Sequence, residues 1–381
     1  MIRITDKKDC CGCGACVQRC PKQCIVMQSD KEGFTYPVVN KKGCSNCGLC
    51  DKVCPVINQQ SRQQPIATYA AINFNQATRR ESSSGGIFIL LAEETINNGG
   101  VVFGAAFNSN WQVEHTFADN LDDIKKFRGS KYVQSNIGNN YAVAEKFLKE
   151  GKEVLFSGTP CQVAGLKRYL RKEYRNLKTV DFVCHGVPSP KVWKKYLKEV
   201  CLAYNIATIT DIQFRNKTEG WKKFSLQITY TDNDGKERIF REPLNENLFM
   251  ECFLNDLCLR PSCYQCPARC GKSGSDITLG DLWGAEYICP DIDDDKGLSL
   301  VILRKERGFQ LGDKMSVPYN EILKYNRAIE YNMHKPKQRS KFFKKAFKKG
   351  ICKTTIQCRT QSWISVLWEK IVWNVKNRIL K

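Results

Sequence analysis

Apolar and polar residues along positions 65–331 follow two different periods, and together they predict a mixed α/β domain. Short apolar runs at 68–73, 100–107, 113–118, 153–156 and 179–183 have the length and composition of strands. Stretches with helical spacing at 86–97, 142–150 and 162–171 lie between several of these runs. Strands that alternate with helices favour a largely parallel sheet with helices on its faces.

The pattern changes over residues 209–240. Alternating runs here flank Asp232-Asn-Asp-Gly235, a sequence that favours a tight turn between two paired strands. We therefore expect an antiparallel insertion within the larger domain. Apart from two cysteine runs near the N-terminus, we find no internal repeat.

Three further segments complete the organisation of the chain. Residues 1–58 contain ten of the 21 cysteines, and the polar stretch 58–64 reads as a linker. Beyond the mixed domain, residues 335–381 hold fourteen Lys or Arg residues and one acid, so most of the net charge of +21 belongs to this tail. The fold class is α/β (α+β), with a cysteine-rich module over 1–58, the mixed domain over 65–331 and a basic amphipathic helical tail over 332–381.

The composition is that of a soluble globular protein, with 42% hydrophobic and 26% charged residues. The longest uninterrupted apolar stretch, Ile87–Ala92, is far shorter than the roughly 20 residues of a membrane-spanning helix. Charged residues and cysteines follow Met1 directly, so we expect no secretory signal and a cytoplasmic protein. In such a chain, 21 cysteines favour metal binding over a disulfide scaffold.

The N-terminal cysteines form two runs with the same spacing, Cys10-x2-Cys13-x2-Cys16-x3-Cys20-Pro and Cys44-x2-Cys47-x2-Cys50-x3-Cys54-Pro. Three thiolates on one tight loop can bind three corners of a 4Fe–4S cubane, while the fourth cysteine reaches the other cluster. The spacing therefore predicts a two-cluster ferredoxin-like module. We assign the first cluster to Cys10, Cys13, Cys16 and Cys54, and the second to Cys20, Cys44, Cys47 and Cys50.

A pair of structural zinc sites is the alternative for these runs. Zinc normally takes two Cys-x2-Cys pairs that lie farther apart, so the spacing favours iron–sulfur clusters. Cys11 and Cys24 fall outside the pattern, and we interpret both as free, small apolar residues.

Four cysteines of the larger domain are candidates for a third cluster. Cys161 and Cys184 each follow a predicted strand, and the carboxyl ends of parallel neighbours lie at one sheet edge. A Cys263-x2-Cys266 pair in a loop could complete a four-thiolate site. The alternative is a set of scattered buried thiols, and Cys270 is a rival for one position.

Three segments have the composition of a nucleotide-cofactor site. Glu81-Ser-Ser-Ser-Gly-Gly86 opens a helix after a strand, where hydroxyls and amides could hold a phosphate, although a plain serine-rich helix cap is an equal alternative. Arg128–Gln134 combines cations, small residues and an aromatic ring, and Asp276–Gly284 places two acids and a tryptophan around a short strand. Neither a dinucleotide fingerprint nor a P-loop motif occurs.

These motifs together resemble the coenzyme F420 hydrogenase/dehydrogenase β-subunit family, which includes deazaflavin-reducing hydrogenase subunits and plant 7-hydroxymethyl chlorophyll a reductase. The matching segments are Ser83–Gly86, Gly129–Gln134, Gly158–Gln162, Val183–Gly186, Cys263–Cys266 and Ser275–Gly284. The resemblance implies a bound FAD beside a third 4Fe–4S cluster on Cys161, Cys184, Cys263 and Cys266. It also implies that flavin contacts come from Ser83, Ser84, Gly85, Gly86, Gly129, Ser130, Lys131, Tyr132, Gln134, Asp276 and Asp281.

This set of cofactors predicts an oxidoreductase in which electrons pass from the N-terminal clusters through the third cluster to FAD, and then as a hydride to an unidentified organic substrate. Ferredoxin or another low-potential donor is the expected partner. The alternative is a non-catalytic relay subunit of a larger redox complex, and a redox sensor is a third reading. No element typical of nucleic-acid binding occurs. Candidates for proton transfer or substrate binding are Lys131, Tyr132 and His185, although His185 is better suited to a hydrogen bond that supports the cluster.

The tail combines lysines with aromatic residues at 341–349 and continues into a tryptophan-rich apolar stretch over 363–378. This pattern is typical of a helix that lies on an anionic membrane surface, which would place the protein at the inner face of the membrane. Docking on the protein's own body or on an acidic partner is the alternative.

Overall fold

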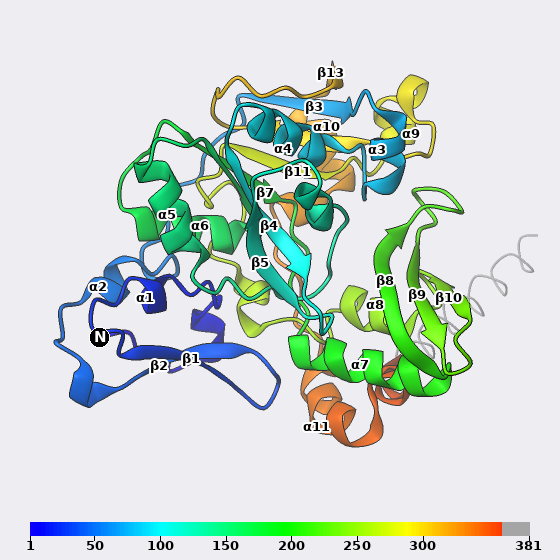
Figure 1. The fold of residues 1–381 in the computed structure, drawn as a ribbon, viewed down its shortest axis with the longest axis horizontal. Coiled ribbons are helices and arrows are strands. Elements are labelled where there is room, and N and C mark those ends of the chain that lie inside the picture. The colour runs from blue at the N-terminus through cyan, green and yellow to red at the C-terminus, as the bar shows by residue number, and fades with distance from the viewer. Residues whose placement is uncertain (360–381) are drawn as a thin grey trace, which may run out of the picture.

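The computed structural model describes residues 1–359, and at its centre lies an eight-stranded mixed sheet (Figure 1). The strand order is β13-β3-β12-β11-β7-β6-β4-β5. The strands are β3 (Ala67–Ile72), β4 (Val101–Phe107), β5 (Val113–Ala118), β6 (Val154–Gly158), β7 (Leu177–Phe182), β11 (Ile277–Asp281), β12 (Ser299–Leu303) and β13 (Asp313–Ser316).

The mixed α/β class is confirmed, but only the middle of the sheet is parallel. Strands β4, β6, β7 and β11 run parallel to one another, as the alternation of strands and helices predicts. The flanking strands β5, β12, β3 and β13 pair antiparallel with their neighbours. The short loop between β4 and β5 is itself typical of an antiparallel pair, because parallel neighbours need a long crossover. The expectation of a largely parallel sheet did not include the antiparallel strands β12, β3 and β13 on the other side.

Helices cover both faces of the parallel strands, which explains why these strands are apolar at consecutive positions. On one face α4 (Ile87–Asn97) and the 3-10 turn η3 (Asp123–Phe127) pack against Leu155. On the other face α5 (Asn140–Lys149) and α6 (Pro160–Leu170) pack against Phe156. The short polar helix α3 (Gln76–Glu81) precedes α4 and escaped prediction.

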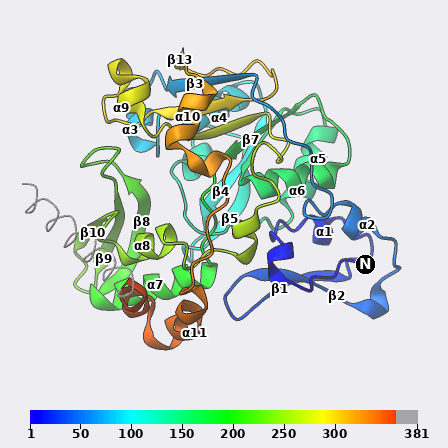
Figure 2. The same cartoon turned by 180° about the vertical axis from the view of Figure 1, so that it is seen from behind.

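The predicted antiparallel insertion is present, and it forms a separate layer beside the main sheet (Figures 1 and 2). It contains α7 (Pro190–Ala203), β8 (Ile206–Asn216), β9 (Ser225–Asp232), β10 (Glu237–Pro243) and α8 (Leu248–Leu254). The β9–β10 turn falls at the predicted Asp232-Asn-Asp-Gly sequence. There, the Asp232 carboxylate accepts hydrogen bonds from the amides of Asp234 at 3.0 Å and Lys236 at 2.9 Å.

The N-terminal module packs below α5 and α6 (Figure 1). Its elements are η1 (Lys7–Asp9), α1 (Ala15–Gln18), β1 (Ile25–Ser29), β2 (Thr35–Val39), η2 (Lys41–Gly43) and α2 (Leu49–Lys52). The Gln18 side chain caps the start of α5, because its Oε1 accepts the amides of Tyr141 at 3.0 Å and Ala142 at 3.2 Å. The module is therefore joined to the helices that cover the sheet.

The remaining elements line the end of the sheet and the C-terminal region. They are η4 (Pro261–Gln265), α9 (Ala285–Ile288), η5 (Pro290–Ile292), α10 (Tyr319–Tyr325), η6 (Arg327–Ile329) and α11 (Arg339–Lys349). Helix α11 turns Phe342, Phe343 and Ala346 into the core beside α7, so of the three readings of the tail, docking on the protein's own body describes this part. The predicted apolar stretch 363–378 lies outside the described residues. No helix within residues 1–359 is both long and apolar enough to cross a membrane.

Candidate functional site

The two cysteine runs of the N-terminal module line two separate small cavities. Within each run a glycine with φ near +75°, Gly14 or Gly48, starts the short helix that carries the third cysteine, Cys16 or Cys50. One cavity is lined by Cys10, Cys13, Cys16 and Cys54, and the other by Cys20, Cys44, Cys47 and Cys50. The fourth cysteine of each run thus lines the cavity of the other run.

Backbone amides approach the sulfurs of the second cavity. The amide of Ile2 donates to Cys50 Sγ at 3.1 Å, and the amide of Asn46 lies 3.4 Å from Cys44 Sγ. Amides that hydrogen-bond cluster thiolates stabilise their negative charge. Cys24, which the spacing leaves out, also lines this cavity, with its sulfur 3.4 Å from Cys20 Sγ. Cys47 is the one exposed cysteine among the eight predicted ligands of the module.

The four cysteines of the predicted third site converge from three segments. Strands β6 and β7 are parallel neighbours, so Cys161 and Cys184 emerge at the same edge of the sheet. Burial raises the pKa of the Cys184 thiol, and the nearby thiols of Cys263, Cys161 and Cys266 act on it as well. Partly buried sulfurs gathered at one site repel one another as thiolates unless a metal centre compensates their charge. Within residues 1–359, however, no three His, Cys, Asp or Glu side chains already stand close enough together to hold a metal ion.

The rival Cys270 lines a small cavity beside Cys184 and Cys266. Its thiol, however, donates a 2.9 Å hydrogen bond to the carbonyl oxygen of Glu330. The backbone of Cys270 is left-handed, with φ of 58°. This arrangement binds the thiol to the main chain rather than leaving it free for a metal.

The N-terminal module and the third site meet at Cys11, which the sequence did not single out. The pKa of the buried Cys11 thiol is raised, and the thiols of Cys13 and Cys161 are the first two groups that act on it, so both lie close to Cys11. Gly165 on α6 allows this approach, because a β-carbon there would lie 2.9 Å from Cys13 Cβ. Predicted ligands of two different clusters are therefore separated by a single side chain.

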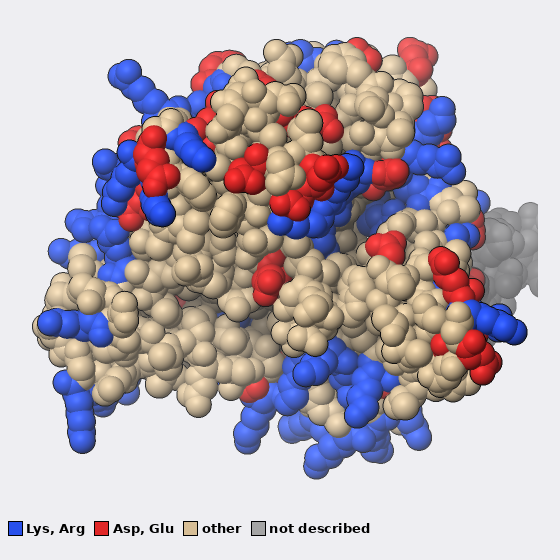
Figure 3. Space-filling model, in the orientation of Figure 1, with Lys and Arg blue, Asp and Glu red and all other residues tan. Residues whose placement is uncertain are grey.

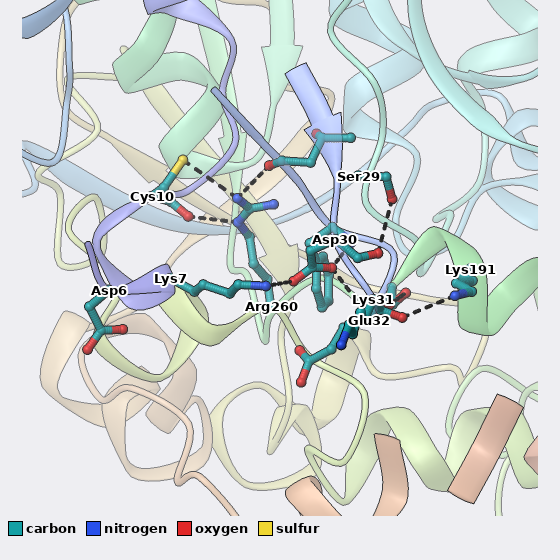
Figure 4. Close-up of polar contacts among 12 residues, drawn as sticks. Asp6, Lys7, Cys10, Ser29, Asp30, Lys31, Glu32, Lys191 and Arg260 are labelled. Carbon is teal, nitrogen blue, oxygen red and sulfur yellow. Dashed lines mark hydrogen bonds and ion pairs between the residues drawn. The ribbon is translucent and has the colours of Figure 1, made fainter. Parts of the chain in front are cut away.

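Arg260 binds the N-terminal module to the larger domain, and the close-up in Figure 4 shows its contact with Cys10. Its fully buried guanidinium donates to the carbonyl oxygens of Cys10 at 2.8 Å and Thr35 at 2.9 Å, and to Gln134 Oε1 at 3.1 Å. It also lies 3.6 Å from Cys10 Sγ and 4.4 Å from the ring centroid of Tyr36. Arg260 lies three residues before Cys263, so the segment that carries a predicted ligand of the third cluster also binds Cys10, a predicted ligand of the first cluster.

A cavity of about 560 Å³ opens at the carboxyl ends of the parallel strands, where ligands of α/β sheets collect. It reaches the third site at Cys184 and is walled on its far side by the insertion, including Phe224 and Phe253. Of the predicted flavin-contact residues, it brings together Ser83, Ser84, Gly86, Gly129, Ser130, Lys131, Tyr132 and Asp281.

The Ser83–Gly86 turn is built to leave the start of α4 open. Gly86 is the N-cap of α4, with φ of 85°, and no side chain of the described residues caps the first amides of that helix. The Ser84 hydroxyl donates to the carbonyl of Leu298 at 2.8 Å, and Lys217 Nζ lies 3.2 Å from the Ser84 carbonyl. Uncapped amides in the first turn of a helix, with hydroxyls and cations nearby, suit a phosphate group.

Charged groups line the opposite part of the cavity. The buried Arg215 forms a 2.6 Å ion pair with Asp281 and lies 3.3 Å from the Tyr132 hydroxyl. Its Nε is buried without a hydrogen-bond acceptor among residues 1–359. Burial lowers the pKa of Lys131 to about 7. This donor set, together with the apolar wall, fits a flavin nucleotide, which combines an anionic pyrophosphate with a large aromatic ring.

Two histidines lie at the cavity, and the sequence singled out only one of them. The Nε2 of His185 is 2.7 Å from Asp256 Oδ1, so the hydrogen bond observed for this ring is to a carboxylate. His115 lies between the Ser157 carbonyl at 3.0 Å and the Ser135 hydroxyl at 2.9 Å, and burial lowers its pKa to about 4. His115 is therefore neutral at physiological pH. A lone histidine within a strand gave no signal for this position.

Three of the predicted cofactor residues lie outside the cavity. Gly85 packs against the sheet, where a β-carbon would come within 2.3 Å of the Ala71 carbonyl oxygen. Gln134 accepts from Arg260 at the module interface. Asp276 lies at the opposite end of β11, where its carboxylate accepts from the amide and the hydroxyl of Thr179, both at 2.7 Å. All three residues therefore make contacts within the protein and do not line the cavity.

Comparison with known families agrees with this geometry. Residues 9–58 match the 4Fe–4S dicluster domain, and residues 151–322 match the family model for the C terminus of the coenzyme F420 hydrogenase/dehydrogenase beta subunit. The chain is thus an iron–sulfur protein of the electron-transfer class. More particularly, its residues 151–322 are similar to the C terminus of the coenzyme F420 hydrogenase/dehydrogenase beta subunit, in agreement with the resemblance noted in the sequence. The dicluster match also favours iron–sulfur clusters over zinc.

One of the solved structures that match is a chain of the F420-reducing [NiFe] hydrogenase complex from Methanosarcina barkeri, studied after xenon derivatization. The match covers 79% of the present chain and 93% of the hydrogenase chain, with 16% sequence identity and a TM-score of 0.42. A search of curated proteins finds no match.

Proposed function

We propose that this protein is an iron–sulfur flavoprotein oxidoreductase that carries electrons from an external donor to an organic substrate. The observation that carries the proposal is the position of the 560 Å³ cavity, which joins the Ser83–Gly86 turn and the Gly129–Tyr132 loop to Cys184 of the third cysteine site. A flavin accepts single electrons from iron–sulfur clusters and delivers a hydride. Its site therefore has to lie between a cluster and the substrate.

The order of the cysteine sites in space supports one path for electron transfer through the protein. Cys47 of the second N-terminal set is exposed, so this set is the outermost. The first set approaches the third set at Cys11, whose pKa is shifted by the nearby thiols of Cys13 and Cys161. Cys184 of the third set lines the cavity. We infer that electrons pass from the second N-terminal cluster to the first, then to the third cluster and the flavin.

Within the cavity, the protein's own residues would bind the nucleotide and supply a proton to the substrate. The uncapped amides of α4 and the Ser83 hydroxyl would hold the phosphates, and the aromatic wall of the insertion would exclude water. Arg215 is held by Asp281, which fixes its direction toward the cavity. Lys131 has a pKa of about 7, so it can supply a proton at neutral pH. His115, held neutral, supports the wall through Ser135.

The test is the cofactor content of the full-length protein after anaerobic purification and cluster loading. Three cubanes and one nucleotide site predict about twelve irons and one flavin per chain. Absence of flavin after incubation with FAD would refute the reductase proposal, and about eight irons would remove the third cluster. Reduction of an organic acceptor by the isolated chain distinguishes an enzyme from a relay subunit, which would require a separate catalytic chain.

A further inference from the structure

The outer end of the N-terminal module carries a group of lysines around the exposed Cys47. Lys22, Lys41, Lys42 and Lys52 are all exposed, and each lies within three residues of Cys20, Cys44 or Cys50, the other predicted ligands of the second cluster. Lys22 and Cys47 line the same cavity. We call the surface formed by these four lysines the donor surface.

The positive charge of the donor surface is not neutralised by the protein itself. Most acids of the module are engaged elsewhere: Asp51 with the amino terminus at 2.9 Å, Asp30 with Lys7, Asp6 with Lys8 and Glu32 with Arg339. Among residues 1–359 no acidic side chain forms an ion pair with any of the four lysines. Their charges are therefore available to a partner.

The charge continues from Lys52 into a groove of about 450 Å³ between α2 and the end of α6. Six cations line this groove, and its one acid, Glu173, is paired with Lys305 at 3.1 Å. The cations are Lys52, Lys167, Arg168, Arg171, Lys172 and Lys305. A concave surface of one sign concentrates the electric field and attracts a partner of the opposite sign.

We propose that the donor surface, extended by this groove, is the docking site of an acidic one-electron carrier protein. The proposal rests on the proposed function, in which electrons enter at the second N-terminal cluster. The exposed Cys47 gives the carrier access to that cluster, and the unpaired lysines orient it by charge complementarity. The carrier's reduced centre loses one electron, the second cluster gains it, and no bond or proton is exchanged. Rim charges of this kind act mainly on the rate of association and make it depend on salt.

A second basic surface of the molecule provides a matched control. Lys341, Lys344, Lys348 and Lys349 are exposed on α11, whose lysines contribute to the blue side chains gathered along the lower margin in Figure 3. None of the predicted cluster ligands lies on this helix. Four Lys→Glu substitutions on α11 change the net charge by the same amount as four on the donor surface.

The experiment measures how fast a reduced, acidic 2Fe–2S ferredoxin transfers electrons to the full-length, cluster-loaded protein, by anaerobic stopped flow at low and high salt. The donor-surface variant (Lys22→Glu, Lys41→Glu, Lys42→Glu, Lys52→Glu) should lose about tenfold or more in rate at low salt and should no longer slow as salt is added. The α11 variant should behave as the wild type, and four Lys→Arg substitutions on the donor surface should preserve the rate.

Dithionite separates the two proposals, because this small reductant needs no docking. If dithionite reduces the clusters but not a bound flavin in the wild type, the proposed wire is wrong. If dithionite reduces all variants equally and the donor-surface variant alone is slow with ferredoxin, the docking site is supported. A donor-surface variant that retains the wild-type rate and salt dependence, or an α11 variant that is slowed instead, overturns it.

Discussion

The backbone amide of Ser130 donates a 2.7 Å hydrogen bond to the hydroxyl oxygen of Ser83. These residues lie 47 positions apart and belong to the two loops predicted to contact a flavin. The bond joins the two loops at the N-terminus of α4. The Ser83–Gly86 turn and Lys131 therefore line the same cavity. Binding of a nucleotide at this point therefore depends on both segments together.

Ser83→Ala should weaken flavin binding because it removes the acceptor of the Ser130 amide and a hydroxyl from the cavity. We expect a loss of about tenfold in FAD affinity, which corresponds to about 1.4 kcal/mol. Fluorescence titration of the flavin-free protein with FAD measures this loss. Ser82→Ala is the matched control, since the Ser82 hydroxyl donates to the Thr78 carbonyl at 2.7 Å and lies outside the cavity. Equal losses in both variants would contradict the assignment.

Cys184→Ser should remove the third cluster while leaving the N-terminal pair intact. The expected iron content falls from about twelve to about eight per chain, because one cubane of four irons loses a ligand. Iron analysis and electron paramagnetic resonance of the reduced protein measure the change. Cys270→Ser should keep the full iron content, since that thiol donates to the Glu330 carbonyl. If Cys270→Ser loses four irons and Cys184→Ser does not, Cys270 is the cluster ligand and Cys184 is not.

Lys131 should make turnover depend on pH near neutrality. Burial lowers its pKa to about 7, so the ammonium form that can donate a proton disappears as pH rises through that value. We expect kcat with an organic acceptor to fall above pH 7 in the wild type. In Lys131→Gln we expect a lower kcat that no longer falls above pH 7. Lys125→Gln, at an exposed lysine, should leave the profile unchanged. An unaltered profile in Lys131→Gln would show that another group titrates.

The same shift predicts the sign of a stability effect. The pKa of Lys131 is lower in the folded protein than its ordinary value of 10.5, so between about 7 and 10.5 the unfolded chain binds more protons. This residue therefore destabilises the fold increasingly as pH falls through that window, and its effect is constant below it. In Lys131→Met this contribution should vanish, which denaturant unfolding at about pH 7 and about pH 9.5 measures as a smaller difference between the two pH values.

Local patterns in the sequence were sufficient for the parts of the site that lie on regular elements. Cys161 and Cys184 follow buried strands that are parallel neighbours, so a rule about sheet edges brought them together correctly. The two cysteine runs carry their geometry in their own spacing, and the fourth cysteine of each run lines the cavity of the other run.

Contacts between distant segments were beyond prediction, because no local period encodes which surfaces pack together. Gln134 belongs to a loop motif, yet its side chain faces Arg260 and the N-terminal module. Asp276 and Asp281 are both acids of one motif, but they lie at opposite ends of β11 and only Asp281 reaches the cavity. Cys11 has the sequence context of a spare apolar residue, and only the docking of α1 on α6 places its thiol between two predicted clusters.

Gly165→Ala should slow electron transfer between the N-terminal clusters and the third cluster. A β-carbon at this position would lie 2.8 Å from the Tyr141 hydroxyl oxygen and 2.9 Å from Cys13 Cβ, closer than real contacts allow, and 3.0 Å from Cys13 Sγ, so α6 must move away from the cluster loop and from α5. The helix itself should not suffer, because alanine is a better helix former than glycine by about 1 kcal/mol. A slower transfer therefore reports how closely the cluster loop and α5 pack on α6.

The measurement is single-turnover reduction of the full-length protein by dithionite, followed separately at the N-terminal clusters and at the flavin. In Gly165→Ala the N-terminal clusters should be reduced at the wild-type rate, since their exposed end at Cys47 is unchanged, whereas the flavin should follow more slowly. Cys11→Ala tests the same gap without crowding it, because it removes the sulfur that lies near both Cys13 and Cys161. If both variants reduce the flavin as fast as the wild type, electrons do not cross between the modules at this contact.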